Sequence, residues 1–140
     1  MVEHIEIKFV DSWSEDEIES LYKAGGWWKS NYDKSLINPM ISGSFVFVVV
    51  IDLKNNKTIG MGRVISDGVS DGYIQDLVIL PEYRGKGIGK KLVKSLIDYC
   101  FSKGLVWIGL IAEPGSEKFY SDLGIKPMKG CIPMRYHMEE

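Results

Sequence analysis

Three glycines alternate with other residues in the segment Arg84-Gly85-Lys86-Gly87-Ile88-Gly89-Lys90, which follows an apolar run. Glycine lets the backbone approach a ligand closely and adopt conformations that are closed to other residues. The segment leads into a helical pattern, and the N–H groups of a helix's first turn lack intrahelical acceptors and lie at the positive end of the helix dipole. With the charges of Arg84, Lys86 and Lys90 at its rim, the segment predicts a phosphate-binding loop that suits a pyrophosphate.

Two common nucleotide-binding motifs do not fit this loop. A P-loop requires Gly-x-x-x-x-Gly-Lys followed by Ser or Thr, whereas Lys91 follows Gly89-Lys90 and Arg84 stands in place of the first glycine. A dinucleotide fingerprint requires G-x-G-x-x-G near the start of a doubly wound sheet. Here the glycine spacing differs and two or three predicted strands come first, so the sequence argues against both kinds of site.

The elements that must position the loop follow from the apolar periodicity. A capping box formed by Ser14 and Glu17 predicts a helix that ends at Gly25-Gly26. Other helices are expected over residues 33–41, 87–103 and 116–123. Strands are expected over residues 4–10, 45–51, 58–66, 73–80, 106–112 and 134–138. The helix after the loop joins strands 73–80 and 106–112, which implies a parallel pair within one mixed α/β sheet.

Composition excludes several functional classes. The chain has 140 residues, of which 45% are hydrophobic and 26% charged, as in an ordinary soluble domain. Lys plus Arg is 17 and Asp plus Glu is 19, so the net charge of −2 argues against a protein that coats nucleic acid or an acidic membrane. The longest apolar run, residues 45–51, is too short to span a bilayer. Cys100 and Cys131 lack metal-type spacing, so we expect no metal, and we expect a cytoplasmic protein.

The loop resembles the Q/R-x-x-G-x-G/A signature of the GNAT superfamily of acyl-CoA-dependent N-acetyltransferases, and Leu77-Val78-Ile79-Leu80-Pro81 resembles that family's central strand. A second block, Phe119-Tyr120-Ser121-Asp122-Leu123-Gly124-Ile125, is similar to the family's F-Y-x-x-L-G-F element, with Ile125 in place of Phe. The resemblance covers nearly the whole chain. It implies an α/β (α+β) GNAT fold in a single domain over residues 1–140. That fold has a mixed, mostly antiparallel sheet of six to seven strands, a parallel split around the coenzyme A site and about four flanking helices.

The resemblance also implies how acetyl-CoA, the expected cosubstrate, is held. The backbone of residues 77–79 would pair with the pantetheine arm, and the N–H groups of residues 84–90 would hold the pyrophosphate. The implied donor-binding residues are Leu77, Val78, Ile79, Arg84, Gly85, Lys86, Gly87, Ile88, Gly89 and Lys90. Tyr120 would be the general acid toward the departing thiolate. Many family members carry Asn before the last helix, where this chain has Ala112-Glu113-Pro114-Gly115.

Direct attack by an amine in a ternary complex requires a base or a water chain, because an alkylamine is mostly protonated at neutral pH. Asp76 is the first candidate because it immediately precedes residues 77–79. Glu113 is the second, since it lies at the carboxyl end of the neighbouring parallel strand. A backbone N–H at Val78 or Ile79 is the expected donor to the oxyanion. For Asp76 the alternative is a brace within the sheet, and for Tyr120 it is a core aromatic.

The acceptor is expected to be a small primary amine. Trp27, Trp28 and Tyr32 lie where the family places its acceptor-covering segment, although ordinary packing explains them equally well. Four acidic residues could attract a cationic acceptor: Asp67, Asp71, Asp76 and Glu113. The stretches 62–67 and 74–77 are similar to arylalkylamine acetyltransferases. Polyamines, amino sugars and protein amines remain open as acceptors.

Two alternatives come from other functional classes. A non-catalytic acyl-CoA sensor would bind coenzyme A without turnover. A nucleic-acid-binding helix would use its basic face, formed by Lys86, Lys90, Lys91 and Lys94, and its binding would depend strongly on salt. Charges opposite an apolar stripe are usually a solvated face, however. The expected partners are therefore a small-molecule amine and neither nucleic acid nor membrane, and a homodimer is left open.

Overall fold

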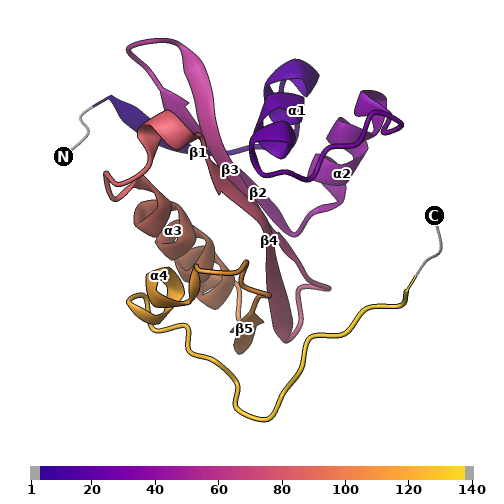
Figure 1. The fold of residues 1–140 in the computed structure, drawn as a ribbon, viewed down its shortest axis with the longest axis vertical. Helices are drawn as coiled ribbons and strands as arrows, with labels where there is room; N and C mark the ends of the chain where they lie inside the picture. Colours follow the sequence, from indigo (N-terminus) through magenta and orange to yellow (C-terminus); the bar gives the residue numbers. More distant parts are fainter. Residues whose placement is uncertain (1–3, 138–140) are drawn as a thin grey trace. The chain divides into compact units, whose positions relative to one another are not determined.

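The computed structural model describes residues 4–137, and the chain divides into two compact units at residues 110 and 111 (Figure 1). The first unit contains a five-stranded sheet in the order β1-β2-β3-β4-β5. Its strands are β1 (Ile5–Phe9), β2 (Val46–Asp52), β3 (Lys57–Ile65), β4 (Asp71–Ile79) and β5 (Trp107–Gly109). Its helices are α1 (Glu15–Ala24), α2 (Ile37–Gly43) and α3 (Ile88–Ser102), with 3-10 turns η1 (Lys34–Leu36) and η2 (Pro81–Tyr83). None of the helices described is long and apolar enough to cross a membrane.

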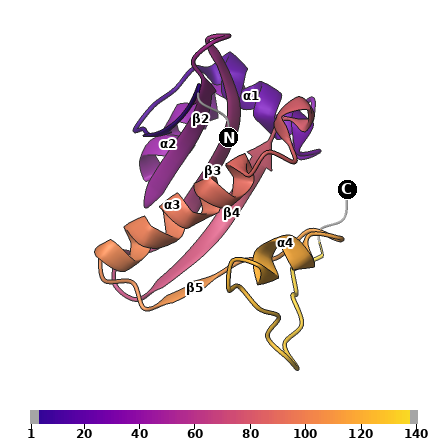
Figure 2. The same cartoon turned by 90° about the vertical axis from the view of Figure 1, so that its left-hand side faces the viewer.

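The sheet is mixed, as the sequence predicts. Strands β1 to β4 pair antiparallel in sequence order, and β5 pairs parallel with β4. Helices α1 and α2 lie on one face of the sheet and α3 on the other (Figures 1 and 2). All seven residues of β2 are buried, which confirms the central strand expected from the uninterrupted β-branched run.

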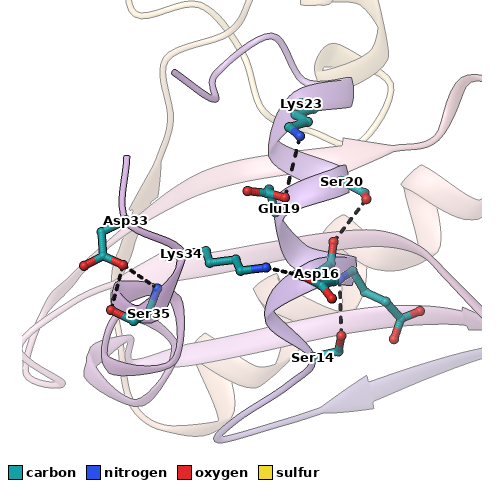
Figure 3. Close-up of polar contacts among 9 residues, drawn as sticks. Ser14, Asp16, Glu19, Ser20, Lys23, Asp33, Lys34 and Ser35 are labelled. Carbon is teal, nitrogen blue, oxygen red and sulfur yellow. Dashed lines mark hydrogen bonds and ion pairs between the residues drawn. The ribbon is translucent and has the colours of Figure 1, made fainter. Parts of the chain in front are cut away.

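Helix α1 begins where the capping box predicts. The Ser14 Oγ atom accepts a hydrogen bond from the Glu17 N–H at 3.3 Å. The Glu17 carboxylate does not complete the box, because it accepts the Thr58 N–H at 3.0 Å and so ties α1 to β3. Lys34 of η1 forms an ion pair with Asp16 at 2.6 Å, which joins the α1–α2 connection to the first turn of α1 (Figure 3).

The expected number of six to seven strands is wrong for the residues described, which form five. A strand is expected over residues 134–138. Residues 134–137 form none, and Met138 lies outside the described residues. Met134 and Tyr136 are 88% and 85% exposed, so the apolar alternation there buries no face of a sheet. The strand expected over residues 106–112 contracts to β5, which pairs with only three residues of β4.

The second unit contains one helix among its described residues, α4 (Glu117–Ser121), within the span expected for it. Gly124 follows with φ +87°, a conformation that favours glycine after a helix. Exposed apolar side chains are frequent in the rest of this unit, including Ile111, Met128 and Ile132. The unit therefore has no extensive core of its own.

Candidate functional site

The glycine loop runs from the end of β4 through η2 into α3. Gly85 and Gly87 have φ values of +77° and +81°, and a Cβ atom at either position would meet nothing within 4 Å. Glycine is therefore required there by backbone conformation, and the space beside both residues is open. Gly87 is the N-cap of α3, without a side-chain cap, and its carbonyl accepts the first helical N–H, from Lys91, at 3.3 Å. The N–H groups of Ile88 and Gly89, in the first turn, lack intrahelical acceptors, as an anion site requires.

Two residues anchor the stem of this loop, which is the segment of residues 80–84 between β4 and the first glycine. The Tyr83 hydroxyl donates to the Asp52 Oδ2 atom at 2.5 Å, and Arg84 Nε donates to the Ile79 carbonyl at 2.8 Å. The Lys86 ammonium lies 5.7 Å from the centre of the Tyr83 ring, within cation–π distance. Arg84 and Lys86 are exposed, so both can add positive charge beside the first turn of α3.

Strand β4 has a free edge next to the loop. Its β5 side pairs only at Asp71–Tyr73, while its β3 side pairs as far as Ile79. Among the described residues, no strand covers residues 74–79 on the β5 side. Among residues 77–79, the backbone groups that point to this edge can therefore pair with an extended ligand. The Ile79 carbonyl already accepts Arg84 Nε, and the edge leads directly into the loop.

A β-bulge interrupts β4 one residue before Leu77. Met61 is opposite Val78 and Arg63 is opposite Gln75, so Gly62 faces two residues of β4, Asp76 and Leu77. Asp76 has φ +58°, which is uncommon for a residue other than glycine. A bulge bends its strand and re-aims a side chain, and here it accompanies the splaying of β4 from β5.

The Asp76 carboxylate is held by donors from two other elements. Its Oδ2 atom accepts hydrogen bonds from the Tyr22 hydroxyl of α1 and from Arg63 Nε of β3, each at 2.7 Å. The Arg63 and Asp76 side chains are only 16% and 20% exposed, so water screens their ion pair weakly. Burial and the nearby negative charge of Asp76 raise the pKa of Tyr22, which therefore stays protonated as a donor.

An aromatic cluster of the α1–α2 connection surrounds Tyr22. The rings of Trp27 and Trp28 lie 6.2 and 6.3 Å from the Tyr22 ring, and Tyr32 lies edge-on to Trp28 at 5.5 Å. The three aromatics expected near an acceptor therefore gather around the residue that binds Asp76. They also serve the packing role that was the alternative, because Trp27 and Trp28 pack against the core.

Other predicted residues lie elsewhere. Asp67 is in the β3–β4 turn, where its Oδ1 atom accepts the Val69 N–H at 2.8 Å, and the structure does not bring it to Asp76. Lys94 forms an ion pair with Asp98 at 2.9 Å on the exposed face of α3, which fits the interpretation of that face as solvated.

Tyr120 and Glu113 belong to the second unit. The Tyr120 ring contacts the Phe119 ring edge-on at 5.0 Å. Burial, with a smaller effect of the Glu113 charge, raises the pKa of Tyr120. Its phenol therefore stays protonated at neutral pH, as a general acid must.

Sequence reasoning missed four residues of this region: Tyr22, Arg63, Tyr83 and Asp52. Tyr22 lies on the buried face of α1 like an ordinary core aromatic, although its hydroxyl binds Asp76. Arg63 carried a usable signal, because a lone cation within the apolar stretch of β3 must find a partner or reach water.

Comparison with known proteins gives concordant results. The sequence pattern of the acetyltransferase (GNAT) family matches residues 6–125. An uncharacterized N-acetyltransferase, ycf52, of Pyropia yezoensis is 34% identical over 124 residues, which is 86% of this chain and 70% of that protein. A GNAT-family acetyltransferase from Streptococcus pneumoniae has a TM-score of 0.77 and 25% identity, covering 97% of this chain and 99% of its own. AAC(6')-Iy, solved with the bisubstrate analogue CoA-S-monomethyl-acetylneamine, has a TM-score of 0.73 and 18% identity, covering 96% and 99%.

Proposed function

Since the chain belongs to the GNAT family of acetyltransferases, we propose that it transfers an acetyl group from acetyl-CoA to a primary amine of a small molecule. The amine attacks the thioester directly in a ternary complex. The family match spans residues 6–125 and thus both compact units. We propose accordingly that residues 1–140 act as one acetyltransferase domain.

The observation that carries this proposal is the continuous path from the free edge of β4 to the first turn of α3. Residues 77–79 offer backbone groups to the pantetheine arm, and residues 84–90 offer N–H groups and cations to the pyrophosphate. The solved complex of AAC(6')-Iy contains an analogue built on coenzyme A. That protein has the same fold, which supports the choice of donor.

The proposed acceptor site lies around Asp76 and the aromatic cluster of Trp27, Trp28 and Tyr32. A carboxylate beside aromatic rings suits an ammonium group attached to an apolar body, because both attract a cation. The Oδ1 atom of Asp76 accepts no hydrogen bond from the described residues, whereas Oδ2 accepts two. Oδ1 is therefore the atom that can meet the amine.

In the proposed reaction the amine loses a proton to Asp76 Oδ1, directly or through water, and its nitrogen then attacks the thioester carbon. The Asp76 carboxylate, held by Arg63 and Tyr22, then passes the proton on to water. Glu113 is the second candidate for this role. A backbone N–H of Val78 or Ile79 stabilises the oxyanion. As the C–S bond breaks, the Tyr120 hydroxyl protonates the leaving thiolate, and the extra proton on the attacking nitrogen returns to the Tyr120 phenolate through solvent, which leaves the neutral amide.

The test is a panel of amines with acetyl-CoA, read by release of free thiol. The panel contains tryptamine, spermidine, glucosamine and a peptide with a free N-terminus and a lysine, so that it covers the four open acceptor classes. We expect turnover with at least one small amine. Binding of coenzyme A without turnover on any of them would favour the sensor alternative.

The same assay tests the roles of two residues. Replacing Tyr120→Phe should lower kcat by about 100- to 10,000-fold, because a positioned acid contributes on that scale. Asp76→Asn keeps an acceptor for Arg63 and Tyr22 but cannot take a proton, so it should lower kcat. Asp67→Asn, in the β3–β4 turn, is the matched control. An Asp76→Asn enzyme with an unchanged kcat would limit Asp76 to a brace.

A further inference from the structure

The carboxylate of Asp52, the last residue of β2, accepts hydrogen bonds from several donors. It accepts the N–H groups of Lys54 and Asn55 at 3.0 and 3.3 Å, and the Asn55 side-chain amide at 2.7 Å. These donors belong to the β2–β3 turn that follows Asp52. The fourth donor is the Tyr83 hydroxyl at 2.5 Å, from η2, which follows the end of β4; that end of β4 pairs with the start of β3, next to the same turn. Asp52 is therefore the point where the turn and the stem of the glycine loop are joined.

The hydrogen bond between Tyr83 and Asp52 is charge-assisted. The Tyr83 hydroxyl, with smaller contributions from Asn55 and Lys54, lowers the pKa of Asp52 to about 2. The same bond raises the pKa of Tyr83. The carboxylate is thus ionised and the phenol protonated throughout the neutral range, and such bonds are roughly twice as strong as neutral ones.

Tyr83 is in a position to orient the loop. It ends η2 and directly precedes Arg84, and the Lys86 ammonium lies over its ring. Gly85 and Gly87 have no side chains with which to hold the loop in place, and their surroundings are open. The conformation of the loop must therefore be fixed at its two ends, by Tyr83 and Arg84 before the glycines and by α3 after them.

We propose that Tyr83, held by Asp52, is a positioning residue for the acyl donor. It fixes the start of the 84–90 loop and places the Lys86 charge beside the site for the pyrophosphate. This inference rests on the proposed function. A loop that is already ordered gives up less conformational entropy when the ligand binds, so Tyr83 acts on donor affinity and not on the bond-making step.

The test compares a donor that has a pyrophosphate with one that lacks it. Tyr83→Phe removes the hydroxyl but keeps the ring under Lys86, whereas Tyr83→Leu removes both. We expect Tyr83→Phe to raise the Kd of coenzyme A and the KM of acetyl-CoA about tenfold, a size typical of losing one hydrogen bond to a charged group. We expect kcat, and the KM of S-acetylpantetheine, to stay unchanged. Tyr83→Leu should weaken coenzyme A further.

The control is Tyr73→Phe, which removes a hydroxyl that has no protein partner in the part of the chain that the structure describes. It should leave all of these constants unchanged. Asp52→Asn keeps an acceptor for Tyr83 but removes the charge, so it should change donor affinity in the same direction and by less. Thermal unfolding of each variant confirms that it is folded.

The outcomes are distinguishable. Unchanged affinity for coenzyme A in folded Tyr83→Phe would overturn this inference alone. An equal loss with S-acetylpantetheine, or a fall in kcat, would assign Tyr83 a general structural role and would also overturn it. Failure of the unmodified chain to bind coenzyme A would overturn the proposed function and this inference with it.

Discussion

Two carboxylates, Asp52 and Asp76, each join elements that are distant in the sequence. Asp76 Oδ2 binds Tyr22 across 54 positions, and Asp52 Oδ2 binds Tyr83 across 31 positions. In both cases a tyrosine hydroxyl donates to a carboxyl oxygen in a partly buried setting. The two carboxylates differ in their surroundings, because Asp76 also meets the Arg63 cation whereas Asp52 meets only neutral donors.

The low pKa of Asp52 predicts a contribution to acid stability. The pKa is about 2 in the folded protein and 3.8 as a free side chain, so unfolding in this range takes up a proton. The stability that Asp52 provides is therefore fully present above about pH 4 and is lost as the pH falls toward 2. Replacing Asp52→Asn should lower the free energy of unfolding at pH 7 more than at pH 2.5. Urea unfolding at both pH values measures this, and an equal loss at both would contradict the assignment.

At the residue scale, the sequence predicted what depends on local spacing and missed what depends on distant partners. The alternating glycines before an amphipathic helix identified the loop, because backbone conformation and helix ends are local properties. Tyr83 directly precedes this loop, yet nothing near it in the sequence indicates Asp52 as its partner. Asp76 was chosen from its neighbours in β4, and its pairing with Arg63 depends on the bulge, which shifts the register opposite Gly62.

At the scale of elements, the end of β4 is the part that would position the proposed donor site, and two glycines of β3 fit against it. Gly60 pairs with Ile79, and Gly62 lies opposite the bulge. A Cβ atom at Gly60 would lie 3.1 Å from the Val78 carbonyl oxygen and 3.3 Å from Val50 Cβ, in addition to the end of the Ile79 side chain. The Val78 carbonyl and Val50 Cβ cannot rotate away, since one is backbone and the other is attached to it.

Replacing Gly60→Ala is therefore expected to destabilise the fold by about 1–3 kcal/mol, the usual cost of overpacking. Gly62→Ala is the matched control. A Cβ atom there would meet only side-chain ends, Leu77 Cδ1 at 2.8 Å and Leu96 Cδ1 at 3.1 Å, which can move aside. Urea denaturation compares the two variants. A loss of stability from Gly62→Ala as large as that from Gly60→Ala would contradict the argument.

In two of the predicted elements that form as expected, the apolar residues are buried. The uninterrupted run of β2 and the apolar stripe of α3 lie in the core, and burial is what a periodic pattern reports. The prediction of a strand over residues 134–138 is wrong for the described residues, because no apolar face is buried there. The segment's apolar residues alternate, but those described are exposed, so pattern alone did not create a strand.

At the scale of the whole molecule, the family could be identified from the sequence and the acceptor could not. The loop and the block around Tyr120 are contiguous stretches in a fixed order, and the matched region of residues 6–125 contains both. The proposed acceptor site instead combines side chains of α1, β3, β4 and the α1–α2 connection. No short motif contains such a set, so its members emerged only from the fold.

Although the chain's net charge is only −2, basic and acidic side chains lie at separate places along β4 and the loop. Arg84 and Lys86 are exposed on the loop at the N-terminus of α3, while Asp76 lies in the bulge of the same β4 strand that leads into that loop. An anionic donor and a cationic acceptor would therefore meet opposite charges at the two places proposed for them.

The most direct test of the central claim, that residues 84–90 hold the pyrophosphate of acetyl-CoA, is a thermal-shift comparison of coenzyme A, acetyl-CoA, ATP and NAD. A ligand at a hundred times its Kd should stabilise the fold by about 2.7 kcal/mol, which corresponds to several degrees in Tm. We expect such a shift with coenzyme A and acetyl-CoA and not with ATP or NAD. The absence of a shift with both coenzyme A species, or a larger one with ATP or NAD, would contradict the assignment of the loop.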